Sequence, residues 1–138
     1  MTIYAYTDGA SRGNPGESGI GILLKNEEGS ILYSGSGYIG LATNNIAEYE
    51  ALLICLQKVS GMECSKLIVH SDSQLIVRQI LGEYRVKDKK LQKYYSDVNQ
   101  AVLSARFVFE IKHIDREQNR DADRLANIGI DSKKKLRI

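Results

Sequence analysis

The hydrophobic pattern of the chain changes its period once, near Thr43, and this change restricts the folds that the sequence can adopt. Before Thr43, three short runs carry strand-forming residues and are separated by turn residues, which is typical of β-strands. These runs cover residues 3–7, 19–25 and 31–39. Because the connections between them are short, the three strands are predicted to form an antiparallel meander.

After Thr43, apolar residues recur at steps of three and four, which predicts helices that alternate with short apolar strands. Thr43, Asn44 and Asn45 supply candidate N-caps for the first helix, and Gly61 ends it. Further strands are predicted over 66–70 and 107–114, and further helices over 74–81, 91–105 and 121–130. Strands separated by helices imply right-handed crossovers. The fold class is therefore α/β, with a five-stranded mixed sheet in which we expect the first, fourth and fifth strands to be central neighbours.

The composition fits one globular domain. The chain has 138 residues, of which 26% are charged and 43% apolar, enough for a single hydrophobic core. We predict one domain over 1–131 and a basic tail over 132–138, since four of the 19 basic residues lie in the last six positions. No apolar run is long enough to span a bilayer, and the two cysteines lack metal-ligand spacing. A cytoplasmic protein without membrane contact is expected.

Two carboxylates occupy positions that core packing explains poorly. Asp8 ends the first predicted strand, next to Gly9, which lets another backbone come close. The structural alternative is an ordinary Asp-Gly turn. Glu48 is followed by Leu52, Cys55 and Val59 at steps of four, three and four, so it lies on the buried stripe of the first helix. A carboxylate aimed at the core requires a partner or a bound ion.

Two further carboxylates follow later strands. Asp72 follows Ser71 after the strand over 66–70, where Asp72 or Ser73 can cap the next helix, and Asp123 lies at the start of the last helix. In a mixed sheet these side chains and Asp8 reach one edge, with Glu48 above them. Oxygen ligands without histidine or thiolate suit Mg²⁺, with Mn²⁺ as a substitute, rather than zinc. Two such ions about 3.5–4 Å apart activate a water and stabilise the leaving oxygen of a phosphodiester.

Four motifs that contain these acids resemble ribonuclease H type 1. They are residues 6–9 with 13–16, residues 43–48, residues 71–74, and His113 followed by Asn119 and Asp123. The resemblance runs from residue 3 to about 127, in the same order and at compatible spacings. It implies a ribonuclease H-like fold, a five-stranded mixed sheet whose first three strands are antiparallel, flanked by helices. It also implies a metal-dependent endoribonuclease that hydrolyses the RNA strand of RNA–DNA hybrids and leaves 5′-phosphate and 3′-hydroxyl ends.

The resemblance also assigns roles to single residues. The four acids, Asp8, Glu48, Asp72 and Asp123, match the metal ligands of the family. Polar residues that match substrate-binding positions are Asn14, Thr43, Asn44, Asn45, Gln74 and Asn119. Amides on the minor-groove side can hydrogen-bond 2′-hydroxyls, which distinguish RNA from DNA. The local sequence alone explains Asn14 equally well as a turn residue, and Thr43 or Asn44 as a helix cap.

Two departures from the family pattern affect substrate grip and proton transfer. The basic, tryptophan-containing handle helix of many bacterial members is absent, as in shorter archaeal-type proteins, because the chain has no tryptophan. Candidates for the grip are Arg85, Lys87, Lys89, Lys90 and the basic tail. His113 matches the position of the family's proton-shuttling histidine, but Arg116 is a competing candidate for assisting the leaving group.

Three alternatives to a hybrid-specific nuclease remain open in the sequence. A nuclease of the same fold can act on other substrates, and double-stranded RNA is the main alternative partner. A non-catalytic module that binds the hybrid is the second alternative. Such a module would be more stable without the four acids, because they repel one another. A purely structural role for the carboxylates is the third, and burial of four acids without metal would be costly. A monomer is expected.

Overall fold

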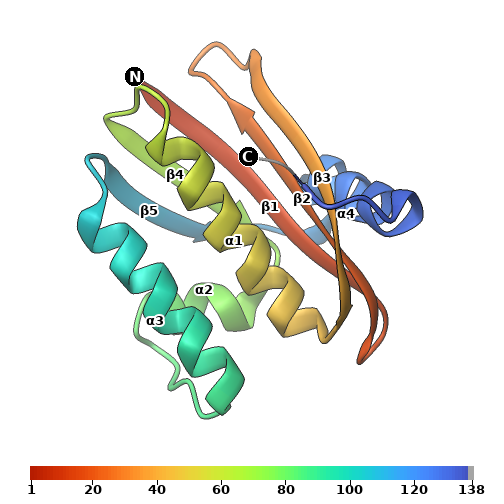
Figure 1. Cartoon of the computed structure of the whole chain (residues 1–138). Coiled ribbons are helices and arrows are strands. Elements are labelled where there is room, and N and C mark those ends of the chain that lie inside the picture. Colours follow the sequence, from red (N-terminus) through yellow and green to blue (C-terminus); the bar gives the residue numbers. More distant parts are fainter. Residues whose placement is uncertain (137–138) are drawn as a thin grey trace.

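The computed structural model describes residues 1–136 as one five-stranded sheet with helices packed on it (Figure 1). The strands are β1 (Thr2–Gly13), β2 (Gly16–Lys25), β3 (Ile31–Ala42), β4 (Lys66–Ser71) and β5 (Val108–His113). The helices are α1 (Asn44–Ser60), α2 (Gln74–Ile80), α3 (Lys89–Ser104) and α4 (Arg120–Ser132), with a 3₁₀ turn, η1 (Arg116–Asn119), before α4. The predicted order of strands and helices is confirmed.

The sheet has the strand order β3-β2-β1-β4-β5. The pairs β1–β2 and β2–β3 are antiparallel, whereas β1–β4 and β4–β5 are parallel. This confirms a mixed sheet whose first three strands are antiparallel. The expectation that the fifth strand is central is wrong for β5, which lies at an edge of the sheet. The crossover through α2 and α3 adds β5 outside β4, and local sequence patterns do not encode that order.

The first strand is longer than the sequence predicted. Instead of ending at Thr7, β1 continues to Gly13, and the ladder with β2 closes at the pair Gly13–Gly16. Pairing with β2 holds the small residues after Asp8 in an extended conformation. Asp8 therefore lies inside a strand, not at a turn. The ladder of β1 with β4, in contrast, ends at the pair Tyr6–His70, two residues before Asp8.

The two faces of the sheet carry different helices. Ile22 and Leu24 point to the core cluster beneath α1, which also packs against α3. On the opposite face of β2, an added Cβ at Gly21 would overlap the backbone of Ala122 in α4. Figure 1 shows α1 lying over β1, with α4 against β2 and β3. Glycines thus let α4 approach the sheet closely.

The segment after α4 lies along β3. The Tyr38 N–H donates a hydrogen bond to the Lys134 carbonyl at 2.8 Å, and Lys133 Nζ lies 2.5 Å from a Glu17 carboxylate oxygen. Leu136 packs against the core cluster. Of the predicted basic tail, Arg137 lies outside the described residues, and the domain boundary at 131 stays a prediction. Within the described chain, no helix combines the length and apolar character needed to cross a bilayer.

Candidate active site

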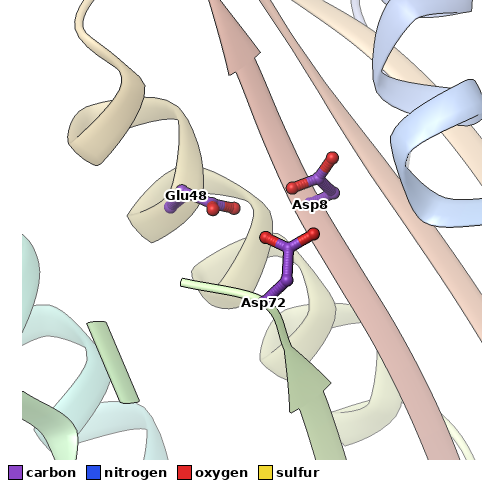
Figure 2. A group of neighbouring side chains, drawn as sticks. All are labelled: Asp8, Glu48 and Asp72. Atoms are coloured by element: carbon purple, nitrogen blue, oxygen red, sulfur yellow. The ribbon is translucent and has the colours of Figure 1, made fainter. Parts of the chain in front are cut away.

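Three carboxylates from three different elements face one another beside the end of β4 (Figure 2). Asp8 comes from β1, Glu48 from α1, and Asp72 from the residue that follows β4. One oxygen of each lies within 4.8 Å of one oxygen of the others. Asp8 is only 5% exposed, and the other two side chains are partly buried. The predicted convergence of these three acids is confirmed.

A glycine determines how closely Glu48 approaches the sheet. A Cβ at Gly9 would overlap the backbone of Ala47 and Glu48, so only glycine lets α1 cross β1 at this distance. The Gly9 N–H also donates a hydrogen bond to Glu48 Oε1 at 2.6 Å. Thr43 caps α1, since its hydroxyl accepts from the Ile46 N–H at 3.2 Å. The predicted close approach at Gly9 and the predicted cap are both confirmed.

The structure decides which residue caps α2. The Ser73 hydroxyl accepts a hydrogen bond from the Ile76 N–H at 3.3 Å, so Ser73 is the cap. The carboxylate of Asp72 is not used for capping and points toward Asp8 and Glu48 (Figure 2). The capping alternative for Asp72 is therefore wrong.

Burial and nearby negative charge raise the pKa values of Asp8 and Glu48. Removal from water raises the pKa of Asp8 most, and the nearby charges of Glu48 and Asp72 raise it further. Burial likewise raises the pKa of Glu48, with Asp72 adding to the effect, whereas the Gly9 N–H and the charge of Arg116 lower it. In the metal-free protein Asp8 and Glu48 therefore hold protons more strongly than isolated carboxyl groups do.

Asp123 joins the cluster from the first turn of α4. Its side chain is exposed, and its hydrogen bond and charge contribute to the raised pKa of Asp8. The Asn127 amide donates to the Asp123 carbonyl at 3.0 Å. All four acids line one open cleft of about 380 Å³. Three oxygen ligands within 4.8 Å, with a fourth acid on the rim, form a donor set that suits a hard divalent cation.

Comparisons of the whole chain with known proteins identify its family. Residues 6–129 match the family model described as reverse transcriptase-like. Ribonuclease HI from Halobacterium salinarum is 36% identical over 129 residues, 94% of this chain. A solved structure of LC11-RNase H1, in complex with an RNA/DNA hybrid, is 40% identical with a TM-score of 0.90 and covers 94% of this chain and 97% of that one. The chain belongs to the ribonuclease H type 1 family.

The match to this ribonuclease H family extends over nearly the whole fold. The crystal structure of RNase H1 from Halobacterium salinarum is 35% identical, with a TM-score of 0.91, and covers 96% of this chain and 99% of that one. The chain spans 64% of the length of the curated Halobacterium relative and 36% of that of the next curated relatives. The resemblance seen in the sequence motifs is thus confirmed at the level of the family and the fold.

Several candidate substrate residues of this ribonuclease H family member line the acidic cleft or the cleft that shares Asn45 with it. Asn44 and Asn45 line the acidic cleft, and Asn14 accepts a hydrogen bond from the Asn44 N–H at 3.1 Å. Gln74 is exposed at the start of α2. A second cleft, of about 470 Å³, is lined by Asn14, Thr43, Asn45, Ile46, Asp88, Lys89, Lys90 and Leu91. We call this second cleft the basic cleft, after Lys89 and Lys90. Asn45 lines both clefts, so the acidic cleft and the basic cleft are adjacent.

The two candidates for assisting the leaving group lie in different places. Arg116, in η1, lines the acidic cleft together with the four acids. His113 is exposed at the end of β5, paired in register with Ser71, and does not line that cleft. The ribonuclease H motif therefore brings the arginine, but not the histidine, to the carboxylates in this structure.

Sequence reasoning missed two residues that line the acidic cleft, and its assignment of Asn119 to substrate binding stays a prediction. Ala10 and Ser11 line the acidic cleft and were missed because the first strand was predicted to end at Thr7. Their signal was the run of small residues after Asp8. Asn119, expected to bind substrate, is only 1% exposed and hydrogen-bonds within the protein.

Proposed function

We propose that this protein is a metal-dependent endoribonuclease that hydrolyses the RNA strand of RNA–DNA hybrids and leaves 5′-phosphate and 3′-hydroxyl ends. The observation that carries the proposal is the approach of three carboxylates, Asp8, Glu48 and Asp72, to within 4.8 Å of one another. They line a cleft of about 380 Å³. Membership in the ribonuclease H type 1 family supports the same reaction and substrate.

The donor set fits Mg²⁺, with Mn²⁺ as a substitute. The ligand atoms are all carboxylate oxygens. Burial, and then the charges of neighbouring acids, raise the pKa values of Asp8 and Glu48, and a bound cation would relieve that repulsion. Asp8, Glu48 and Asp72 would hold one ion, and Asp123 with Asp8 would hold a second. When bound, such ions supply an activated water and charge stabilisation at the leaving oxygen.

The chain's own residues have separate tasks in this proposal. Asp8, which lines the acidic cleft, would help to hold the ions that bind the reacting phosphate. The guanidinium of Arg116 lies in the same cleft, where it can neutralise negative charge at the departing 3′-oxygen. His113 would have to leave its exposed position at the end of β5 to donate a proton to that oxygen.

The adjacent clefts match the two strands of a hybrid. Asn44 and Asn45, with Asn14 and Gln74 nearby, are proposed to hydrogen-bond the 2′-hydroxyls and base edges of the RNA strand. In the second cleft, Thr43 can hydrogen-bond a phosphate of the DNA strand, and the ammonium groups of Lys89 and Lys90 add positive charge there. This basic cleft takes the role of the missing handle helix. Arg85 and Lys87 precede it in the chain.

One assay tests the proposal directly. The same end-labelled strands are presented as RNA–DNA hybrid, RNA duplex, DNA duplex and single-stranded RNA, each with Mg²⁺ and with EDTA. We expect cleavage of the RNA strand in the hybrid, only with Mg²⁺. Efficient cutting of the RNA duplex would move the substrate assignment to double-stranded RNA, and binding without any cleavage would favour a hybrid-binding module.

We further propose that the protein acts as a monomer in the cytoplasm. The acids and both clefts are supplied by a single chain, so the site needs no second subunit. Light scattering of the purified protein tests the first statement, with a mass near 15.4 kDa expected. Fractionation of cells that express the tagged protein tests the second.

A further inference from the structure

The sheet splits at the level of the acidic cluster. The ladder between β1 and β4 ends at Tyr6–His70, although β1 stays paired with β2 to Gly13 and β4 stays paired with β5 to Ser71. Asp8 and Asp72 stand on opposite sides of this split. The ladder between β1 and β4 therefore pairs neither Asp8 nor Asp72 with a residue of the other segment.

One buried side chain bridges the split. The Nδ2 group of Asn119 donates a hydrogen bond to the Thr7 carbonyl at 2.9 Å and a longer one to Asp72 Oδ2 at 3.4 Å. Thr7 directly precedes Asp8, so the amide joins the segments that carry both acids. Asn119 is 1% exposed and Thr7 is 2% exposed, so water does not compete for the bond between them. The Asn119 amide thus connects the two segments beyond the point where the β1–β4 ladder ends.

Asn119 makes this bridge instead of capping its own helix. It occupies the N-cap position of α4, where asparagine is a favoured residue, yet its side chain makes no cap hydrogen bond. The helix that it begins carries Asp123 in its first turn. A single amide therefore relates β1, β4 and α4 to one another. Glu48 is fixed separately, from α1, through Gly9.

The donors, rather than the volume, of this side chain explain its presence. Asn119 Oδ1 is buried and has no hydrogen-bond partner among the described residues. A buried polar atom without a partner is destabilising, and an apolar residue of similar size would avoid that cost. The two N–H donors of Nδ2, in contrast, both have acceptors beside the cluster.

We propose that Asn119 is a positioning residue, which holds Asp8 and Asp72 at the separation that a shared divalent cation requires, without contacting the substrate. The inference rests on the proposed metal-dependent function. It departs from the assignment of Asn119 to substrate binding, because the side chain is buried and turned into the sheet. Residues that orient metal ligands commonly change metal affinity or activity by 10- to 100-fold when they are replaced.

The test measures Mg²⁺ binding without nucleic acid, from the rise of the melting temperature with Mg²⁺ concentration. Asn119→Ala is expected to raise the Mg²⁺ concentration at half-maximal effect by roughly 10-fold or more. Asn119→Ser is a second variant, because serine caps a helix well but is too short to bridge the split. It should keep α4 folded and still shift the Mg²⁺ midpoint.

The matched control removes a different buried amide. Gln79 is 4% exposed and accepts a hydrogen bond from the Tyr49 hydroxyl at 2.7 Å, beneath α1. Gln79→Ala should lower the melting temperature without changing the Mg²⁺ midpoint. Steady-state kinetics on the hybrid give a second comparison. Asn119→Ala should need more Mg²⁺ for a given kcat, while KM for the hybrid at saturating Mg²⁺ stays near that of the native protein.

The outcomes separate the inference from the function on which it rests. If Mg²⁺ does not raise the melting temperature of the native protein, the metal-dependent function and the inference both fail. If the native protein responds but Asn119→Ala and Asn119→Ser keep its Mg²⁺ midpoint, the inference alone is overturned. A raised KM for the hybrid with an unchanged Mg²⁺ midpoint would also overturn it, in favour of direct substrate contact.

Discussion

Replacing Asp8 by asparagine is expected to stabilise the metal-free fold while it abolishes cleavage. Asp8 is 5% exposed, and its carboxylate lies within 4.8 Å of two others. Two like charges at that distance repel by about 3.5 kcal/mol at an effective dielectric constant of about 20. Partial protonation of the cluster relieves part of this repulsion. We therefore expect Asp8→Asn in EDTA to raise the free energy of unfolding by about 2 kcal/mol, or the melting temperature by roughly 6–10 °C.

The same effect has a defined pH dependence. Burial and repulsion raise the pKa of Asp8 in the folded state above its ordinary value of 3.8. At pH values between this ordinary pKa and the raised pKa of the folded state, the native state binds more protons than the unfolded state. The free energy of unfolding of the native protein therefore falls as the pH rises. Asp8→Asn removes one of these groups. The stabilisation measured in EDTA should therefore be small near pH 4 and grow toward pH 8.

Magnesium should reverse the comparison. An ion at 100 times its dissociation constant stabilises the folded state by about 2.7 kcal/mol, and Asp8→Asn weakens the site that binds it. Melting curves in EDTA and in Mg²⁺ check this, together with cleavage of an end-labelled hybrid, which should fall roughly 100-fold or more in the variant. Asp97→Asn, on the exposed face of α3, is the control and should change neither quantity. The reasoning is refuted if Asp8→Asn lowers the melting temperature in EDTA, or keeps a tenth of the native activity.

The remaining predictions concern proton transfer and grip. Arg116→Ala should lower kcat by roughly 100-fold, whereas His113→Ala should stay near native, because only the arginine lines the acidic cleft; kcat measured from pH 6 to 9 checks this, and the opposite ranking would restore the histidine shuttle. Replacing Lys89 and Lys90 together by alanine should weaken hybrid binding and reduce the slope of log K against log salt concentration by about 1–2. Fluorescence anisotropy measures both quantities. An unchanged slope would show that the DNA strand binds elsewhere. Asn45→Ala should raise KM for the hybrid, and an unchanged KM would contradict a minor-groove contact.

Much of the fold follows from local patterns in the sequence. The change of hydrophobic period at Thr43 predicted the switch from meander to helices, and the spacing of Glu48 with the buried residues of α1 predicted that its carboxylate faces the sheet. Gly9 predicted a close approach that the structure contains. These features are local, since periodicity, capping and glycine content act within a few residues of one another.

The errors concern features that depend on distant partners. The small residues after Asp8 have no hydrophobic alternation, and only pairing with β2 keeps them in a strand. The edge position of β5 depends on where a crossover places the strand, not on the strand's own residues. In the same way, the sequence motif around His113 does not determine whether that side chain or Arg116 turns toward the acids, because the intervening loop decides it.

The acidic site lies where the pairing between β1 and β4 ends, and two residues, Gly9 and Asn119, position the acids there. A continued ladder between β1 and β4 would close the gap in which Asp8 and Asp72 stand, and the two carboxylates by themselves drive their segments apart. Gly9 brings α1, and with it Glu48, down onto one side of the gap, while Asn119 ties its two edges together from the start of α4. Gly9 positions Glu48, whereas Asn119 positions Asp8 and Asp72. Replacing Asn119 should therefore leave Glu48 in place, and replacing Gly9 should leave Asp8 and Asp72 in place. The separation of the acids is therefore set by the backbone and by one buried amide before any cation arrives, which is the preorganisation that a metal-dependent hydrolase needs.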